Sequence, residues 1–115
     1  MRSVPRFLQG IHRFEGKGLD RPFPLDASLT YTVPDGVIAQ PVYFRGGNAA
    51  HELICVVLMR DGSPMRYFPI AAKGDVHVPL RVVEDLEPGT AVELHVAAPV
   101  GIAGAVVVDL GLVEV

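Results

Sequence analysis

The sequence has few of the residues that stabilise secreted or membrane-spanning proteins. It contains one cysteine, Cys55, so no disulfide can form within the chain, and this favours a reducing compartment. No apolar run approaches the roughly 20 residues that a membrane-spanning helix needs, and residues 1–16 lack the continuous apolar segment of a secretory signal. We therefore expect a cytoplasmic protein with no membrane partner.

Positive charge is also scarce and scattered. Ten Lys and Arg residues against thirteen Asp and Glu give a formal net charge of −3, and the basic residues form no cluster of the kind that binds nucleic acid. The hydrophobic share, 50% of the chain, is high for a single domain of 115 residues. Apolar surface beyond what one core can hide is most simply covered in a subunit interface. We expect a homo-oligomer, with a protein partner as a further option, and no nucleic acid.

No helical periodicity is visible, and apolar residues recur at a spacing of two. Residues 29–33 (LTYTV), 76–82 (VHVPLRV) and 91–97 (AVELHVA) show this spacing, and turn residues separate them. The pattern is typical of strands with one buried face. We predict an all-β fold for residues 29–115: an antiparallel β-sandwich of roughly seven to nine strands, either immunoglobulin-like or a jelly-roll.

The first 28 residues do not show this regular alternation. Their prolines and glycines, three of each, allow regular pairing only briefly, which predicts an extended segment with one short strand around residues 7–14. The segment also carries several large apolar side chains, including Phe7, Ile11 and Phe23, which is too many for a free tail in water. We expect residues 1–28 to form an N-terminal arm that packs on the sandwich.

The most apolar segment lies in the middle of the chain. Residues 53–59 (LICVVLM) contain no charge, and a turn at Asp61-Gly62 joins them to the next strand as a hairpin. Both faces of this strand favour burial, which is worth roughly 1.5–3 kcal/mol for each large side chain. A second sheet covers one face only. The other face needs a flanking segment of this chain, such as the N-terminal arm, or another copy of the chain. We predict a self-association interface there, formed by Leu53, Cys55, Val57 and Met59.

Two groups of polar residues are candidate ligand sites. The first, Arg45-Gly46-Gly47-Asn48, predicts a turn whose backbone N–H groups and guanidinium would hold an anion. The second requires residues 76–82 and 91–97 to form one hairpin with Arg81 opposite Glu93. That register would gather four polar side chains on one exposed strip suited to an anion, a metal or a carboxylate ligand: His77, Arg81, Glu93 and His95. A solvated cross-strand ion pair, worth ~0.2–1 kcal/mol, is the alternative interpretation.

Neither a metal site nor a catalytic site is predicted. One cysteine and four dispersed histidines do not match the ligand spacings of zinc or copper sites. The serines lack a G-x-S-x-G context, and the apolar surroundings of Cys55 oppose thiolate formation. We expect no cofactor and a non-catalytic interaction or accessory module that self-associates. A small-ligand-binding domain for an anion or a carbohydrate is the alternative, although the absence of tryptophan weakens the carbohydrate case.

Overall fold

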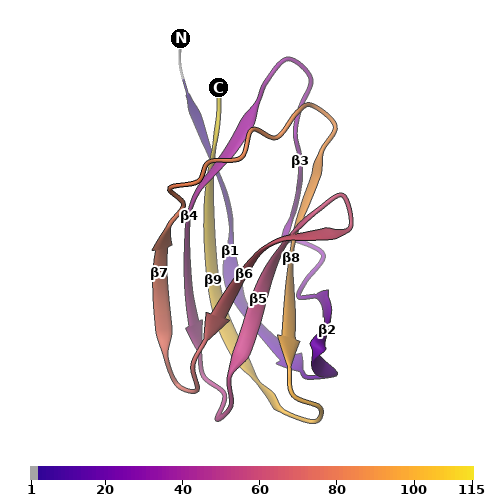
Figure 1. Cartoon of the computed structure of the whole chain (residues 1–115), viewed down its shortest axis with the longest axis vertical. Coiled ribbons are helices and arrows are strands. Elements are labelled where there is room, and N and C mark those ends of the chain that lie inside the picture. Colours follow the sequence, from indigo (N-terminus) through magenta and orange to yellow (C-terminus); the bar gives the residue numbers. More distant parts are fainter. Residues whose placement is uncertain (1–2) are drawn as a thin grey trace.

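The computed structural model describes residues 3–115, which form two antiparallel β-sheets packed face to face (Figure 1). Sheet A has the strand order β1-β9-β4-β7, and sheet B has the order β2-β8-β5-β6 with β3 as a further neighbour of β8. The strands are β1 (Val4–Glu15), β2 (Gly18–Pro24), β3 (Thr30–Thr32), β4 (Ala39–Asn48), β5 (Ile54–Arg60), β6 (Ser63–Ile70), β7 (Asp75–Pro79), β8 (Ala91–Ala98) and β9 (Ala103–Glu114). Within residues 3–115, no helix has the length and apolar character needed to cross a membrane.

The strand pairing is nested, as in one long hairpin that has been folded over. β1 pairs with β9, β2 with β8, β4 with β7 and β5 with β6. This nesting, wrapped into two sheets, is the jelly-roll topology. In an immunoglobulin fold the last two strands share one sheet, whereas here β8 and β9 lie in different sheets. The prediction of an all-β sandwich is thus confirmed, and the jelly-roll is the alternative that applies.

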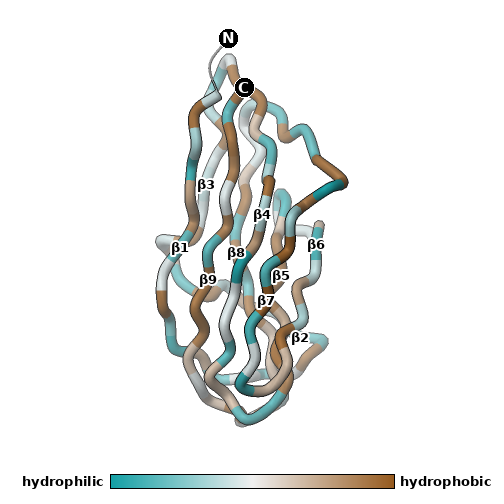
Figure 2. The backbone as a smooth tube through the Cα atoms, turned by 90° about the vertical axis from the view of Figure 1, so that its left-hand side faces the viewer, coloured by the Kyte–Doolittle hydropathy of each residue, from teal (hydrophilic) through white to brown (hydrophobic). Residues whose placement is uncertain are grey.

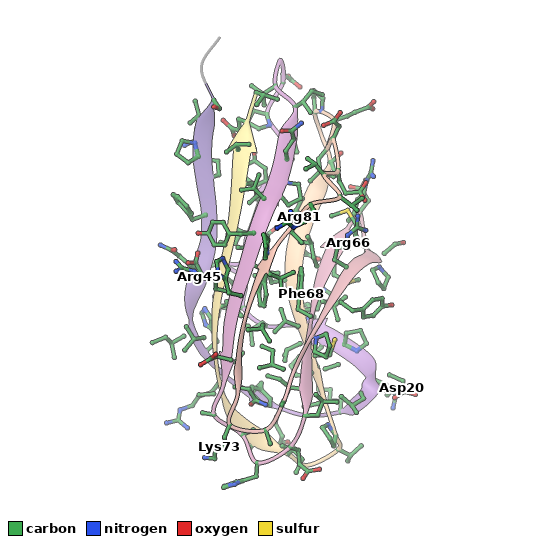
Figure 3. The ribbon with its side chains drawn as sticks, turned by 60° about the vertical axis from the view of Figure 1, so that its left-hand side comes forward. Asp20, Arg45, Arg66, Phe68, Lys73 and Arg81 are labelled. Carbon is green, nitrogen blue, oxygen red and sulfur yellow. The ribbon has the colours of Figure 1, made fainter. Side chains whose placement is uncertain are left out.

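Inward-facing side chains from both sheets fill the space between them. Phe44 of β4 and Phe68 of β6 stack with 4.3 Å between ring centroids and so join the two layers. Figure 3 shows Phe68 between the two sheets. Apolar and polar residues alternate along the strands in Figure 2, which gives each sheet one apolar face for the interior. Other fully buried members of this core include Leu29, Ile54, Leu58, Ile70, Leu94, Leu110 and Leu112.

The N-terminal residues form strands in both sheets, which corrects the predicted arm. β1 pairs with β9 along all twelve of its residues, and β2 forms the margin of sheet B beside β8. Leu8 and Phe14 on the inner face of β1 belong to the buried core. Residues 4–24 therefore build the sandwich rather than lie on it. Of the predicted arm, Met1 and Arg2 lie outside the described residues.

The prolines and glycines of this segment occupy positions where a strand tolerates them. Pro5 lies on β1, an edge strand, where a missing N–H is harmless. Pro22 lies in a bulge of β2, where the register shifts between Gly18 and Phe23. At Gly16 an added Cβ would stand 2.1 Å from the carbonyl oxygen of Pro99, so the two backbones approach each other at a distance that only glycine permits.

The central hairpin forms as predicted. β5 and β6 pair across the turn at Asp61-Gly62. Both turn residues have positive φ, 49° and 81°, as in the tight two-residue loops that match the twist of hairpin strands. The Asp61 side chain also accepts a hydrogen bond from the backbone N–H of Ala91 at 2.9 Å, which ties the turn to the start of β8.

The outer face of β5 is drier than predicted, which corrects the expected interface. Val57 and Met59 are 1% and 6% exposed, Cys55 is half-buried, and Leu53 is exposed at 44%. Two of the four expected interface residues are therefore already covered within one chain. Of the four residues whose exposure motivated self-association through this face, only Leu53 and part of Cys55 remain open to solvent.

Neighbouring strands supply the cover that the sequence prediction omitted. Val57 lies opposite Tyr67 of β6 and His95 of β8 in the register of sheet B. Side chains directly opposite each other in a sheet share a face and touch, so these two larger residues flank the valine on both sides. A central strand can thus be dry on its outer face without a third layer.

Candidate functional site

Side chains from three strands meet on the outer face of sheet A. Because successive residues of a strand point to opposite faces, Tyr43, Arg45 and Gly47 of β4 point away from the core. The residues between them are buried in it. In the register of the sheet, Arg45 lies between His77 of β7 and Asp109 of β9. A polar row therefore crosses the middle of a sheet whose strands are mainly apolar.

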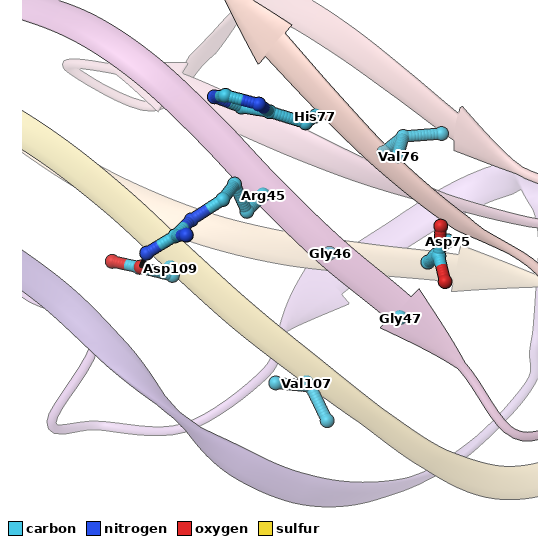
Figure 4. A pocket seen from close by; sticks show the side chains of 8 residues that line it. All are labelled: Arg45, Gly46, Gly47, Asp75, Val76, His77, Val107 and Asp109. Carbon is cyan, nitrogen blue, oxygen red and sulfur yellow. Dashed lines mark hydrogen bonds and ion pairs between the residues drawn. The ribbon is translucent and has the colours of Figure 1, made fainter.

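The polar row is connected by hydrogen bonds to one carboxylate. Asp109 accepts a bond from Arg45 Nη2 at 2.7 Å and a bond from the Tyr43 hydroxyl at 2.9 Å (Figure 4 shows Arg45 reaching toward Asp109). The Arg45 guanidinium lies 5.4 Å from the centre of the Tyr43 ring, and the His77 ring meets that ring edge-on at 6.3 Å. Two rings, a guanidinium and a carboxylate thus form one supported cluster.

Asp109 also holds its two donors in their protonated forms. Its hydrogen bond and negative charge raise the pKa of Arg45 above the usual range. Burial, followed by the hydrogen bond to Asp109, raises the pKa of Tyr43. Tyr43 and Arg45 therefore remain hydrogen-bond donors through the neutral pH range.

A glycine on β9 makes this arrangement possible. Gly111 lies opposite Tyr43 in the register, and an added Cβ there would stand 2.0 Å from Tyr43 Cε2. The tyrosine ring consequently lies flat across β9, which brings its hydroxyl within reach of Asp109. Any larger residue at position 111 would displace the ring.

Beside the cluster is a hollow of about 530 Å³ above Gly47. Its lining comes from β4, β7 and β9 (Figure 4): Arg45, Gly46, Gly47, Asp75, Val76, His77, Val107 and Asp109. A Cβ added to Gly47 would have Val107 Cβ at 3.8 Å as its nearest contact, so the hollow exists because this outward position has no side chain. A second hollow of about 450 Å³ lies on the other side of Val107.

The residues of the first predicted site lie in strand β4 and form no turn. Gly46 points inward, where an added Cβ would come within 2.8 Å of Ile70 and of the Phe44 ring, so this glycine makes room for the stacked core aromatics. Asn48 is 4% exposed, and its amide donates to the carbonyl oxygens of Glu52, Ile70 and Ala71. Asn48 is therefore a structural residue, while Arg45 and Gly47 face the hollow.

The second predicted site does not assemble. β7 belongs to sheet A and β8 to sheet B, because the chain crosses between the sheets in residues 80–90. His77 and Arg81 are thereby separated from Glu93 and His95. The last two remain neighbours on the outer face of sheet B, with His95 Nε2 and Glu93 Oε1 3.2 Å apart. The local alternation of both strands was consistent with one hairpin, and the crossing is invisible to that pattern.

The structure also shows how the metal-ligating and nucleophilic residue types are placed. Within residues 3–115, no three His, Cys, Asp or Glu side chains lie close enough together to hold a metal ion. Burial raises the pKa of the Cys55 thiol, which lowers the fraction of nucleophilic thiolate.

Sequence reasoning missed most of the carboxylate cluster and its support. Tyr43, Asp75, Val107, Asp109 and Gly111 all contribute to the hollow or to the network beside it. One signal was present, since Asp109 is the only charged residue in the run 96–113. An isolated carboxylate in an apolar strand needs a partner, and that partner was Arg45, 64 residues away.

Comparisons with known proteins place the fold and leave the function open. No family model matches the sequence, and no curated protein matches it significantly. One similar solved structure is that of infectious bursal disease virus, Gx strain, with a TM-score of 0.52 and 12% identity over 97% of this chain. Another is exo-β-1,3-galactanase from Phanerochaete chrysosporium, with a TM-score of 0.41 and 12% identity over 100% of this chain. This chain spans about a third of each matched chain, 32% and 30%. At such identities, the first similarity supports the β-sandwich fold alone.

Proposed function

We propose that the protein is a non-catalytic binding module that holds a neutral polyol, such as a carbohydrate, in the hollow above Gly47. One observation carries the proposal. Arg45-Gly46-Gly47 and His77, which belonged to two separate predicted sites, line one hollow together with Asp109. Concave sites with an apolar floor and a few convergent polar groups are the usual form of small-ligand sites. A cytoplasmic setting, inferred from the single cysteine, remains part of this proposal.

The charges around the hollow favour a neutral ligand over an anion. Arg45 is the one guanidinium in the lining, and Asp109 at 2.7 Å already compensates its charge. Asp75 adds a second carboxylate at the rim. An anion would therefore meet one guanidinium that is already compensated and two carboxylates that would repel it.

The donors and acceptors match hydroxyl groups. A sugar hydroxyl both donates and accepts, so it can bond a carboxylate and a guanidinium at the same time. Val107, which is 48% exposed, offers an apolar contact for the C–H face of a ring, and the exposed edge of His77 lies at the same rim. The outward-facing Gly47 has no side chain, which leaves the backbone at this position open to close approach.

The test is a titration of isotope-labelled protein followed by NMR. Neutral mono- and oligosaccharides form one arm, and sodium sulfate and sodium phosphate form two others. We expect a saccharide to shift the amide signals of Gly46, Gly47 and Asp75, and the anions to leave them unchanged. Shifts caused by the anions alone, or saccharide shifts confined to other residues, would contradict the proposal.

A variant that fills the hollow with a side chain tests whether the ligand binds there. Gly47→Val adds a side chain whose Cβ would meet nothing closer than Val107 Cβ at 3.8 Å, and valine suits a strand, so the fold should persist. We expect affinity for the saccharide to fall about tenfold or more, which corresponds to about 1.4 kcal/mol or more. Arg81→Met is the control, because Arg81 is exposed outside this lining. Retained affinity in Gly47→Val would place the ligand elsewhere.

A further inference from the structure

Strand β1 forms one margin of sheet A and has an open edge. It pairs with β9 on one side, and no strand within residues 3–115 pairs with its other side (Figure 2 shows β1 at the margin of its sheet). The pairing with β9 runs through twelve residues without a bulge. Long, regular and uncovered edges of this kind are templates for a further strand.

The hydrogen bonds at both ends of the ladder show which backbone groups are free. Gly16, which directly follows β1, donates to Ile102 O at 2.7 Å and accepts from Gly101 N at 3.1 Å. At this end, the backbone groups of an even-numbered residue therefore point toward the β9 side. At the other end, Val115 exchanges two backbone hydrogen bonds with Ile38, so its backbone groups point to the β4 side. The backbone groups of the preceding residue, Glu114, then point the opposite way, toward Val4 of β1. Because antiparallel bonding alternates, the odd-numbered residues of β1 direct their N–H and C=O groups to the open edge.

The side chains of those same residues lie on the outer face and are exposed. Phe7 is 52% exposed and Ile11 is 74% exposed, and Gln9 and Arg13 are also exposed. Free backbone groups and exposed apolar side chains therefore coincide on alternate residues of one strand.

We propose that a second copy of this chain pairs with the edge, β1 against β1, antiparallel about a two-fold axis at Ile11. This register sets Ile11 against its own counterpart, Gln9 against Arg13 and Phe7 against Glu15. No two like charges face each other, and all five of these residues have a backbone N–H to donate. The two copies of sheet A then form one continuous sheet with closed two-fold symmetry.

The outer face supports the same axis. Ile11 lies opposite Val107 of β9 within one chain, so pairing at Ile11 aligns four apolar side chains across the dimer. Phe14, the bulkiest inner side chain of β1, comes opposite Leu8 of the other copy, and both are core residues. The proposal replaces the β5 face as the self-association surface and does not depend on ligand binding.

Light scattering of the full chain between about 1 and 100 µM tests the assembly. We expect the wild type to reach the mass of a dimer and Ile11→Lys to remain a monomer, because two lysines would meet at the axis. Val100→Lys is the matched control, since Val100 is an equally exposed valine, 78%, in a turn away from β1. A monomeric wild type throughout this range, or a dimeric Ile11→Lys, would overturn the proposal.

Single cysteines test the register. In a Cys55→Ser background, Ile11→Cys places two thiols across the axis, where paired Cα atoms about 5.5 Å apart permit a disulfide. Gln9→Cys, two residues away on the same face, places them too far apart. We expect mild oxidation to crosslink the first variant and leave the second unlinked. The opposite result would move the axis to Gln9 and reject the proposed register.

Discussion

At the scale of single residues, a buried carboxylate connects the two sheets of the sandwich through hydrogen bonds. Glu114 of β9 is 6% exposed and accepts bonds from the Tyr31 hydroxyl at 2.5 Å and from Arg6 Nε at 3.1 Å. Tyr31 belongs to sheet B and Glu114 to sheet A, so this pair links the two layers. The hydrogen bonds from Tyr31 and Arg6 lower the pKa of Glu114, and burial with the bond to Glu114 raises the pKa of Tyr31.

This link predicts a specific acid sensitivity. The pKa of Glu114 is lower in the folded than in the unfolded state, so its contribution to the unfolding free energy is present above the ordinary value of about 4.3. It is lost as the pH falls through the lower folded-state pKa. We expect Glu114→Gln to be less stable than the wild type at pH 7 and to lose less stability between pH 5 and pH 3.

Urea unfolding at several pH values measures this difference. Glu52→Gln is the control, because Glu52 is exposed and its side chain makes no hydrogen bond within residues 3–115. It should follow the wild type at every pH. If Glu114→Gln also ran parallel to the wild type, the Tyr31–Glu114–Arg6 contacts would have no part in acid stability.

At the scale of the elements, two outward positions on neighbouring strands call for glycine for different reasons. Gly111 on β9 leaves room for the Tyr43 ring, whereas Gly47 on β4 leaves the hollow open. We expect Gly111→Ala to cost about 1–3 kcal/mol, because the ring must move and its bond to Asp109 is lost. Gly47→Ala should be neutral or stabilising by roughly 0.5–1 kcal/mol, since alanine loses less backbone freedom on folding.

Denaturant unfolding of both variants checks these opposite signs. A Tyr43→Ala background supplies the control, because without the ring the Gly111→Ala substitution should lose most of its cost. An unchanged cost in that background would assign the effect of Gly111 to the backbone of β9 instead of to Tyr43.

At the scale of the whole molecule, the nested pairing makes the first and last strands depend on each other. β9 lies between β1 and β4 in sheet A, and β1 is its neighbour along twelve residues. Deletion of residues 1–16 would expose one edge of β9 and remove Leu8 and Phe14 from the core. We expect the shortened chain to lose its cooperative thermal transition in circular dichroism.

Deletion of residues 1–3 is the control, because these residues precede β1. The transition should then be unchanged. A sharp transition after deletion of residues 1–16 would show that this segment behaves as the arm expected from the sequence.

The sequence by itself determined what depends on near neighbours along the chain. Alternation at a spacing of two defined the strands, and Asp61-Gly62 defined the central turn, because side-chain direction and positive φ are local properties. It also singled out Arg45 and Gly47, and it drew attention to His77 within the other predicted site.

Only the tertiary structure decided which strands became partners. The same alternation allows β7 and β8 to pair with each other or to enter different sheets, so Arg81 and Glu93 appeared to be neighbours and are not. Pairings between distant segments also decide three other features. They cover Val57 from both sides, they bring Asp109 to Arg45, and they place β1 at an open edge. Such pairings are selected by the burial of the whole core, which no local pattern records.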